Sequence, residues 1–342
     1  MEISMNRSYL IKTITKGYRI FTGFCLSFSL FMVSNVSAGT PVKSGPPAPA
    51  DQTIISDNHG ITMSAHIATG VLNGESREFA YNTSNGAKLS ELIWTIDNVM
   101  MANFGLTLTT PRWLNVNLDF WFNLTDNAEM DDYDWFVTGL PWTHWSNHPD
   151  TTLTSGTMLD INGEINIIAP SEFTLFAIVG FKRDNWSWDA KGGTYIYSVN
   201  GFRDSTGTFP SGQKVISYEQ YFNVPYLGLG FGFGTTSFKV KAKVFGSPYL
   251  WAGQTDDHYL RNLRFESDLS GGTMIGVDIA AFYYFTENFA VSLGVFAQSY
   301  SELKGEETIT DTSTGQSYKV SGDPSGFDHE SAMFSFGLHY RF

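Results

Sequence analysis

The sequence ends in FSFGLHYRF, residues 334–342, where large apolar residues alternate with small or polar ones. Every second side chain from Phe334 to Phe342 is aromatic or leucine, and the residues between them are serine, glycine, histidine and arginine. Successive side chains of a β-strand point to opposite faces. The stretch therefore predicts a strand with one face suited to lipid and one suited to the polar interior of a membrane-spanning barrel.

The same alternation recurs upstream, where apolar residues again occupy every second position of residues 114–122, 159–167 and 238–244. Strands can cross a membrane only as a closed barrel, because hydrocarbon cannot satisfy the backbone groups of an open edge. A chain that ends in such a strand with a terminal Phe342 also resembles bacterial outer-membrane proteins.

The connections between the predicted strands alternate between short and long. Short breaks fall near residues 110–111, 169–171, 235–236 and 286–288, and long polar segments lie near 73–87, 125–149, 188–213, 247–270 and 302–327. Alternation of short and long connections is typical of periplasmic turns and extracellular loops. We therefore predict an all-β fold, a transmembrane antiparallel up-and-down β-barrel of roughly ten strands. Several segments exceed the roughly 9–11 residues needed to cross the hydrocarbon, so the barrel should project outward from the membrane.

Residues 1–38 are predicted to be a secretory signal peptide, since basic residues precede an apolar run that ends at a small-residue cleavage site. Residues 39–57 contain four prolines and predict a flexible N-terminal segment. The barrel would then occupy residues 58–342. Cys25 is the only cysteine and lies in the signal, so no thiol or disulfide chemistry is expected in the mature chain.

The formal net charge is −13 at pH 7. Such an acidic balance disfavours nucleic acid as a partner, because binding to the phosphate backbone depends on cationic side chains. It favours cationic substrates instead.

Two pairs of titratable residues stand out: Asp132 with Asp134, and Asp256 with His258. In a strand, residues two apart share a face. Neighbouring carboxylates tend to retain one proton between them, and a carboxylate beside an imidazole orients it and stabilises its charged form. Both pairs follow predicted strands toward the outer rim, where they are expected to face each other across the mouth and activate water.

Other constellations are weaker. Ser146, His148 and Asp150 contain the residue types of a serine protease triad, but a triad is defined by roles in space rather than by proximity in sequence. His144 and His148 have the spacing of metal ligands on a helix, but Pro149 and the lack of a third nearby ligand argue against a metal site. No metal is therefore expected.

The chain resembles the omptin family, the outer-membrane aspartyl endopeptidases, from Gly74 to Phe342. The motifs that carry the resemblance are residues 132–135, 142–151, 192–198, 201–210 and 256–259. The resemblance implies a ten-stranded barrel in the outer membrane with an extracellular catalytic groove. It further implies the roles of single residues: Asp132 and Asp134 as the carboxylate pair, His258 as general base, and Asp256 as its orienting partner.

Two departures from the family pattern concern ligands. The family holds a basic substrate side chain with two acids; Glu78 matches the first, but Gln254 stands at the second, so weaker selectivity is expected. The family also depends on lipopolysaccharide, and its binding positions here are altered: they read Phe181, Arg183, Asn185 and Tyr221. No other cofactor is expected.

The resulting prediction is an endopeptidase of the cell outer membrane, with its active site facing outward, that cleaves extracellular proteins or cationic peptides near basic residues. The alternative is a catalytically altered barrel that serves as an adhesin or surface receptor. A diffusion pore is disfavoured, because a barrel of about this strand number fills its interior with side chains.

Overall fold

The computed structural model describes residues 60–110, 113–137, 139–170 and 173–342. The predicted signal peptide and the predicted segment 39–57 lie outside the described residues. No helix in the described part of the chain is long and apolar enough to cross a membrane. The strands are β1 (Thr62–Tyr81), β2 (Lys88–Thr109), β3 (Leu114–Asn123), β4 (Asn127–Asp134), β5 (His144–Ile168), β6 (Phe173–Lys191), β7 (Thr194–Tyr197), β8 (Ser205–Thr208), β9 (Lys214–Gly234), β10 (Phe238–Ser247), β11 (Leu250–His258), β12 (Leu263–Gly271), β13 (Met274–Tyr284), β14 (Phe289–Asp311) and β15 (Ser317–Arg341).

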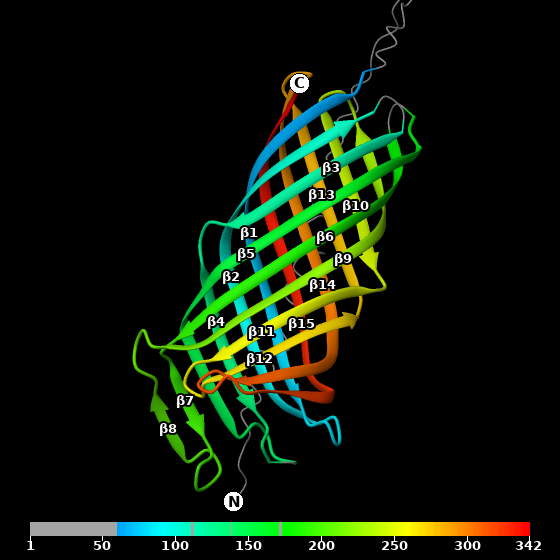
Figure 1. Cartoon of the computed structure of the whole chain (residues 1–342). Coiled ribbons are helices and arrows are strands. Elements are labelled where there is room, and N and C mark those ends of the chain that lie inside the picture. Colours follow the sequence, from blue (N-terminus) through cyan, green and yellow to red (C-terminus); the bar gives the residue numbers. More distant parts are fainter. Residues whose placement is uncertain (1–59, 111–112, 138, 171–172) are drawn as a thin grey trace, which may run out of the picture. The chain divides into compact units, whose positions relative to one another are not determined.

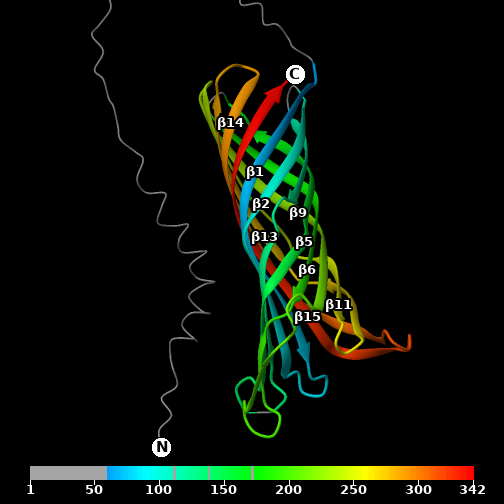
Figure 2. The ribbon, with the colours of Figure 1, turned by 90° about the vertical axis from the view of Figure 1, so that its left-hand side faces the viewer.

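Ten of these strands close a ring in which every neighbouring pair is antiparallel (Figures 1 and 2). Within the described residues the order is β1, β2, β3, β5, β6, β9, β10, β13, β14 and β15, and β15 pairs back onto β1. The terminal stretch that opened the sequence analysis lies in β15, where Phe336 pairs with Thr69 of β1 and Leu293 of β14. The predicted antiparallel barrel is confirmed.

In the outer half of the ring, β4 takes the place of β3, and β11 and β12 take the places of β10 and β13. There β4 lies between β2 and β5, β11 lies between β9 and β12, and β12 also pairs with β14. Much of the polar sequence expected to form long loops is therefore strand. Backbone groups beyond the membrane still need hydrogen-bond partners, and neighbouring strands supply them. The two titratable pairs were expected in long loops, but they lie within strands β4 and β11.

The outer surface of the inner half is apolar. Its exposed large side chains include Phe104, Phe120, Phe181, Leu227, Leu229, Phe231, Phe233, Ile275, Leu293, Phe334, Phe336 and Tyr340. These side chains form the band that faces lipid, as the alternation predicted. Strands β4 and β11, which contain the two titratable pairs, lie beyond this band together with β12.

Part of the interior is filled by side chains. Aromatic side chains pack across it: Trp94, Trp186, Trp188, Tyr218 and Phe222 are at most 1% exposed. The small residues of β9 make room for such side chains, because a Cβ on Gly230 would overlap the Phe176 ring. A filled interior is the arrangement that disfavours a wide channel.

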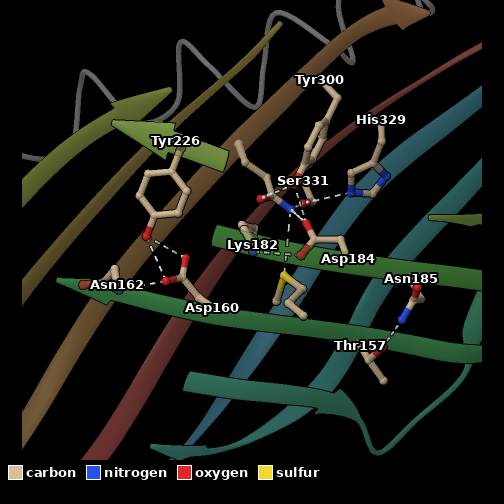
Figure 3. A network of polar contacts seen from close by, with 12 residues as sticks. Thr157, Asp160, Asn162, Lys182, Asp184, Asn185, Tyr226, Tyr300, His329 and Ser331 are labelled. Atoms are coloured by element: carbon tan, nitrogen blue, oxygen red, sulfur yellow. Dashed lines mark hydrogen bonds and ion pairs between the residues drawn. The ribbon is translucent and has the colours of Figure 1, made fainter. Parts of the chain in front are cut away.

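A polar network crosses the interior (Figure 3). It contacts the aromatic cluster through Tyr300, whose ring stacks on Phe222 with a centroid distance of 4.3 Å. The buried Asp184 carboxylate accepts hydrogen bonds from Tyr300 at 2.6 Å and Gln298 at 2.9 Å, and its other oxygen lies 2.9 Å from Lys182 Nζ. Tyr226 donates to Asp160 at 2.8 Å. The buried charge of Asp184 is tolerated here because Lys182 is its ion-pair partner.

Candidate active site

The first pair lies near the outer end of β4. Asp132 is paired in register with Leu92 of β2 and Ser146 of β5, and Asp134 follows two residues later on the same face. The Ser90 hydroxyl lies 3.4 Å from Asp132 Oδ1. Both carboxyl groups are only partly accessible to solvent.

The second pair lies at the end of β11. His258 Nε2 is 2.5 Å from Asp256 Oδ2, and the Asp256 residue is 2% exposed. Because the hydrogen bond holds Nε2 toward the carboxylate, Nδ1 is the ring nitrogen left to accept a proton. The Phe265 ring packs edge-on against the imidazole, with a centroid distance of 5.3 Å.

The two pairs lie close enough together for their charges to interact. Strands β5, β6 and β9 separate β4 from β11 along the sheet, yet the charges of Asp132 and His258 act on each other. Burial, and then the neighbouring Asp134, raise the pKa of Asp132 to about 8. Burial acts to lower the pKa of His258, but the charge and hydrogen bond of Asp256 outweigh it, so that this pKa is raised.

Glu78 of β1 lies beside the second pair. It is 6% exposed, and its Oε2 has no hydrogen-bond donor within the described residues. Burial, and then the charges of Asp256, Glu307 and Asp132, raise the pKa of Glu78 well above its usual range. A carboxyl group that is buried among other acids is poised to accept a cation.

Gln254 lies two residues before Asp256 on the same face of β11, and it is 4% exposed. Its Nε2 donates to Ser325 Oγ at 2.7 Å, and its Oε1 accepts from Tyr218 at 2.8 Å. Both ends of this amide are therefore engaged by the protein.

The serine and histidine of β5 contact each other but lack the third member of a triad. Ser146 Oγ lies 3.0 Å from His148 Nε2, while His148 Nδ1 lies 2.5 Å from the carbonyl oxygen of Gly192 and not against Asp150. Ser146 and His148 are at most 3% exposed. A nucleophile buried this deeply has no access to a peptide.

His144 does not join His148 in a ligand set, since its Nδ1 lies 3.0 Å from Thr143 Oγ1 and its ring packs against Phe136 and Tyr197. Within the described ranges, no group of three His, Cys, Asp or Glu side chains is arranged to hold a metal ion.

Three residues near the site were not singled out from the sequence: Ser90, Tyr197 and Glu307. Burial, and then the charges of Asp132 and Asp134, raise the pKa of Tyr197 to about 12, so its hydroxyl stays protonated beside the carboxylate pair. Tyr197 falls inside one of the motifs noted above, which was a usable signal. Glu307 comes from β14 and carries no local signal at all.

On the outer wall, Arg183 lies in a small polar cluster. Its guanidinium donates to Asn223 at 3.0 Å and Asn185 at 3.2 Å and lies 4.8 Å from the centre of the Tyr221 ring. The Tyr221 hydroxyl donates to Asp268 at 2.9 Å.

Comparisons with known proteins agree with this architecture. The model of the omptin family matches residues 59–342. The plasminogen activator of Yersinia pestis is 31% identical over 303 residues, which is 88% of this chain and 96% of that protein. The outer membrane protease OmpP of Escherichia coli K12 is 30% identical over 285 residues, covering 82% of this chain and 90% of that protein.

The fold agrees as well. The crystal structure of the outer membrane protease OmpT from Escherichia coli superposes with a TM-score of 0.79 at 27% identity, covering 82% of this chain and 97% of that chain. The family resemblance and the outer-membrane location predicted from the sequence are confirmed. This chain is an outer-membrane β-barrel and belongs to the omptin family of proteases.

Proposed function

We propose that this protein is an outer-membrane endopeptidase in which Asp132, Asp134, Asp256 and His258 activate a water molecule against a peptide bond. The observation that carries the proposal is that the charges of a carboxylate pair and of a hydrogen-bonded Asp-His pair, which come from different strands, act on each other. Membership of a family of proteases supports it.

The proposed chemistry needs no covalent intermediate. His258 Nδ1 takes a proton from water as the oxygen attacks the scissile carbonyl carbon, and Asp256 stabilises the imidazolium that forms. Because the pKa of Asp132 is about 8, the carboxylate pair holds a proton at neutral pH. That proton makes a hydrogen bond to the carbonyl oxygen as negative charge develops there. The imidazolium then protonates the peptide nitrogen of the tetrahedral intermediate, the C–N bond breaks, and the carboxylic acid and the amine leave as products.

The proposed substrates are extracellular proteins or peptides cleaved near basic residues. Glu78 is the supporting observation, because its buried carboxyl group lies beside Asp256 and one of its oxygens receives no hydrogen bond from the part of the chain that the structure describes. A guanidinium or ammonium group would supply donors and charge together.

Lipopolysaccharide is a proposed activator that binds the outer wall. Arg183 and Tyr221 form a cluster that fits one phosphate group, with Arg183 as its cation. Asp268 lies next to Tyr221 and would repel a second phosphate. We therefore expect weaker dependence on this lipid than two cationic sites would produce.

The test is cleavage of a peptide library by the folded protein in detergent, with and without lipopolysaccharide, followed by mapping of the cleaved bonds. The proposal expects cleavage near Arg or Lys that disappears in His258→Ala. A folded barrel that cleaves no peptide under either condition would contradict the proposal and favour the adhesin or receptor alternative.

A further inference from the structure

The groove beside the proposed catalytic groups contains a group of buried acids, and within the described residues only Asp256 among them has a side-chain ion-pair partner, His258. Glu78, Asp256 and Glu307 are 6%, 2% and 9% exposed. The charges that act most strongly on Glu78 come from Asp256, Glu307 and Asp132, and all three are acids. Glu78 Oε2 and Asp256 Oδ1 both lack a donor within the described residues. The carboxyl groups of Glu78 and Asp256 are close enough to form a hydrogen bond. That bond requires one of them to be protonated, because two carboxylates have no donor between them.

Gln254 does not complete this group, although it lies next to it on β11. Its amide nitrogen is held by Ser325 at 2.7 Å, and its oxygen is held by Tyr218 at 2.8 Å. An amide also carries no charge, so it gives a basic ligand no ion pair. A second carboxylate to bind a basic substrate side chain would therefore have to come from another strand.

Glu307 of β14 contacts the same serine, Ser325, that binds Gln254. Ser325 of β15, which accepts the hydrogen bond from Gln254, also hydrogen bonds to Glu307. Ser325 is completely buried and is contacted by Ser267 of β12 at 3.1 Å, so four strands meet at this hydroxyl. The charges of Asp256 and His258 both act on Glu307. Its carboxyl group therefore belongs to the groove and not to the outer surface.

We propose that Glu307 supplies the second carboxylate that holds a basic substrate side chain, in the place that Gln254 leaves uncharged. A guanidinium or ammonium seated between Glu78 and Glu307 would give Glu78 a donor and would place a positive charge beside both acids. The inference deepens the proposed function and rests on it. It also changes one expectation from the sequence, since selectivity for basic residues would be retained and not relaxed.

Electrostatics adds a supporting observation. Burial, and then the charge of Asp256, raise the pKa of Glu307 to about 7, although the hydrogen bond from Ser325 and the charge of His258 oppose this. A cation bound directly to the carboxylate would offset the cost of burying its charge.

The experiment compares two matched peptides, one with arginine and one with its neutral isostere citrulline at the cleaved position. The ratio of their kcat/KM values is independent of the fraction of protein that is folded. Wild type, Glu307→Gln, Glu306→Gln and the double variant Gln254→Glu/Glu307→Gln are measured. Glu306 is the matched control, because it is exposed on the opposite face of β14 and pairs with Lys319.

Wild type should prefer arginine, and Glu307→Gln should lower the ratio about tenfold, the factor that corresponds to about 1.4 kcal/mol. Glu306→Gln should leave the ratio unchanged, and the double variant should restore it, because Gln254→Glu returns a carboxylate to the groove. The inference is overturned if Glu307→Gln keeps the wild-type ratio, if the double variant fails to restore it, or if wild type does not prefer arginine. If wild type cleaves neither peptide nor any member of the library, the proposed function itself fails, which is a separate result.

Discussion

Replacing Asp256 with asparagine tests the proposed base most directly. The variant keeps the size of the side chain and an oxygen that can still accept from His258, but it removes the charge 2.5 Å from the imidazole. A hydrogen bond to a charged group contributes about 1.5–3 kcal/mol. Since about 1.4 kcal/mol in the barrier is tenfold in rate, stabilisation lost from the imidazolium should lower kcat about 10- to 150-fold.

The same substitution should change the pH dependence. Asp256 is the largest influence that raises the pKa of His258. Without it, the effect of burial dominates and the pKa falls, so the imidazole stays neutral at lower pH. The acidic limb of the pH profile of kcat/KM should therefore move to lower pH while the maximal rate decreases. A purely structural role for Asp256 would lower the rate without this displacement.

The assay is hydrolysis of a fluorogenic peptide by the folded barrel in detergent, from mildly acidic to alkaline pH. Asp257→Asn is the matched control, because Asp257 points to the other face of β11 and pairs with Arg264 at 2.8 Å. The reasoning is refuted if folded Asp256→Asn retains a rate within threefold of wild type, or if the control loses as much activity.

Three further outcomes are expected. The wild-type rate should fall as pH drops through the raised pKa of His258, because the base must be neutral, and it should fall again above about pH 8, where Asp132 loses its proton; a flat profile of kcat/KM against pH would exclude both roles. Lys182→Met should lower the free energy of unfolding in urea by about 3–5 kcal/mol, because it leaves the buried Asp184 charge without its cation. Its double variant with Asp184→Asn should recover most of that loss, and a loss below 1 kcal/mol in the single variant would contradict the argument. Arg183→Ala should reduce the stimulation of peptide cleavage by lipopolysaccharide without affecting cleavage in pure detergent, and equal stimulation of both proteins would remove the proposed lipid site.

The features that the sequence determined by itself depend on local periodicity. Alternation in residues 334–342 and its repeats predicted the lipid-facing band and the closed antiparallel ring, because a period of two is a property of each strand alone. The same period put Asp132 with Asp134, and Asp256 with His258, on shared faces. Both inferences need only neighbours along the chain.

Other features were decided only by the tertiary structure, because they depend on which strands pair and in which register. Segments expected as loops became β4, β11 and β12, since polar strands beyond the membrane have no lipid-facing alternation to reveal them. Glu307 lies 51 residues after Asp256, and it reaches the groove because β12 pairs with both β11 and β14. The sequence indicated that Gln254 replaces an acid of the family pattern. Only the contacts of Ser325 showed that the carboxyl group of Glu307 lies nearby on another strand. Such neighbours arise from pairing between distant strands, which no local pattern encodes.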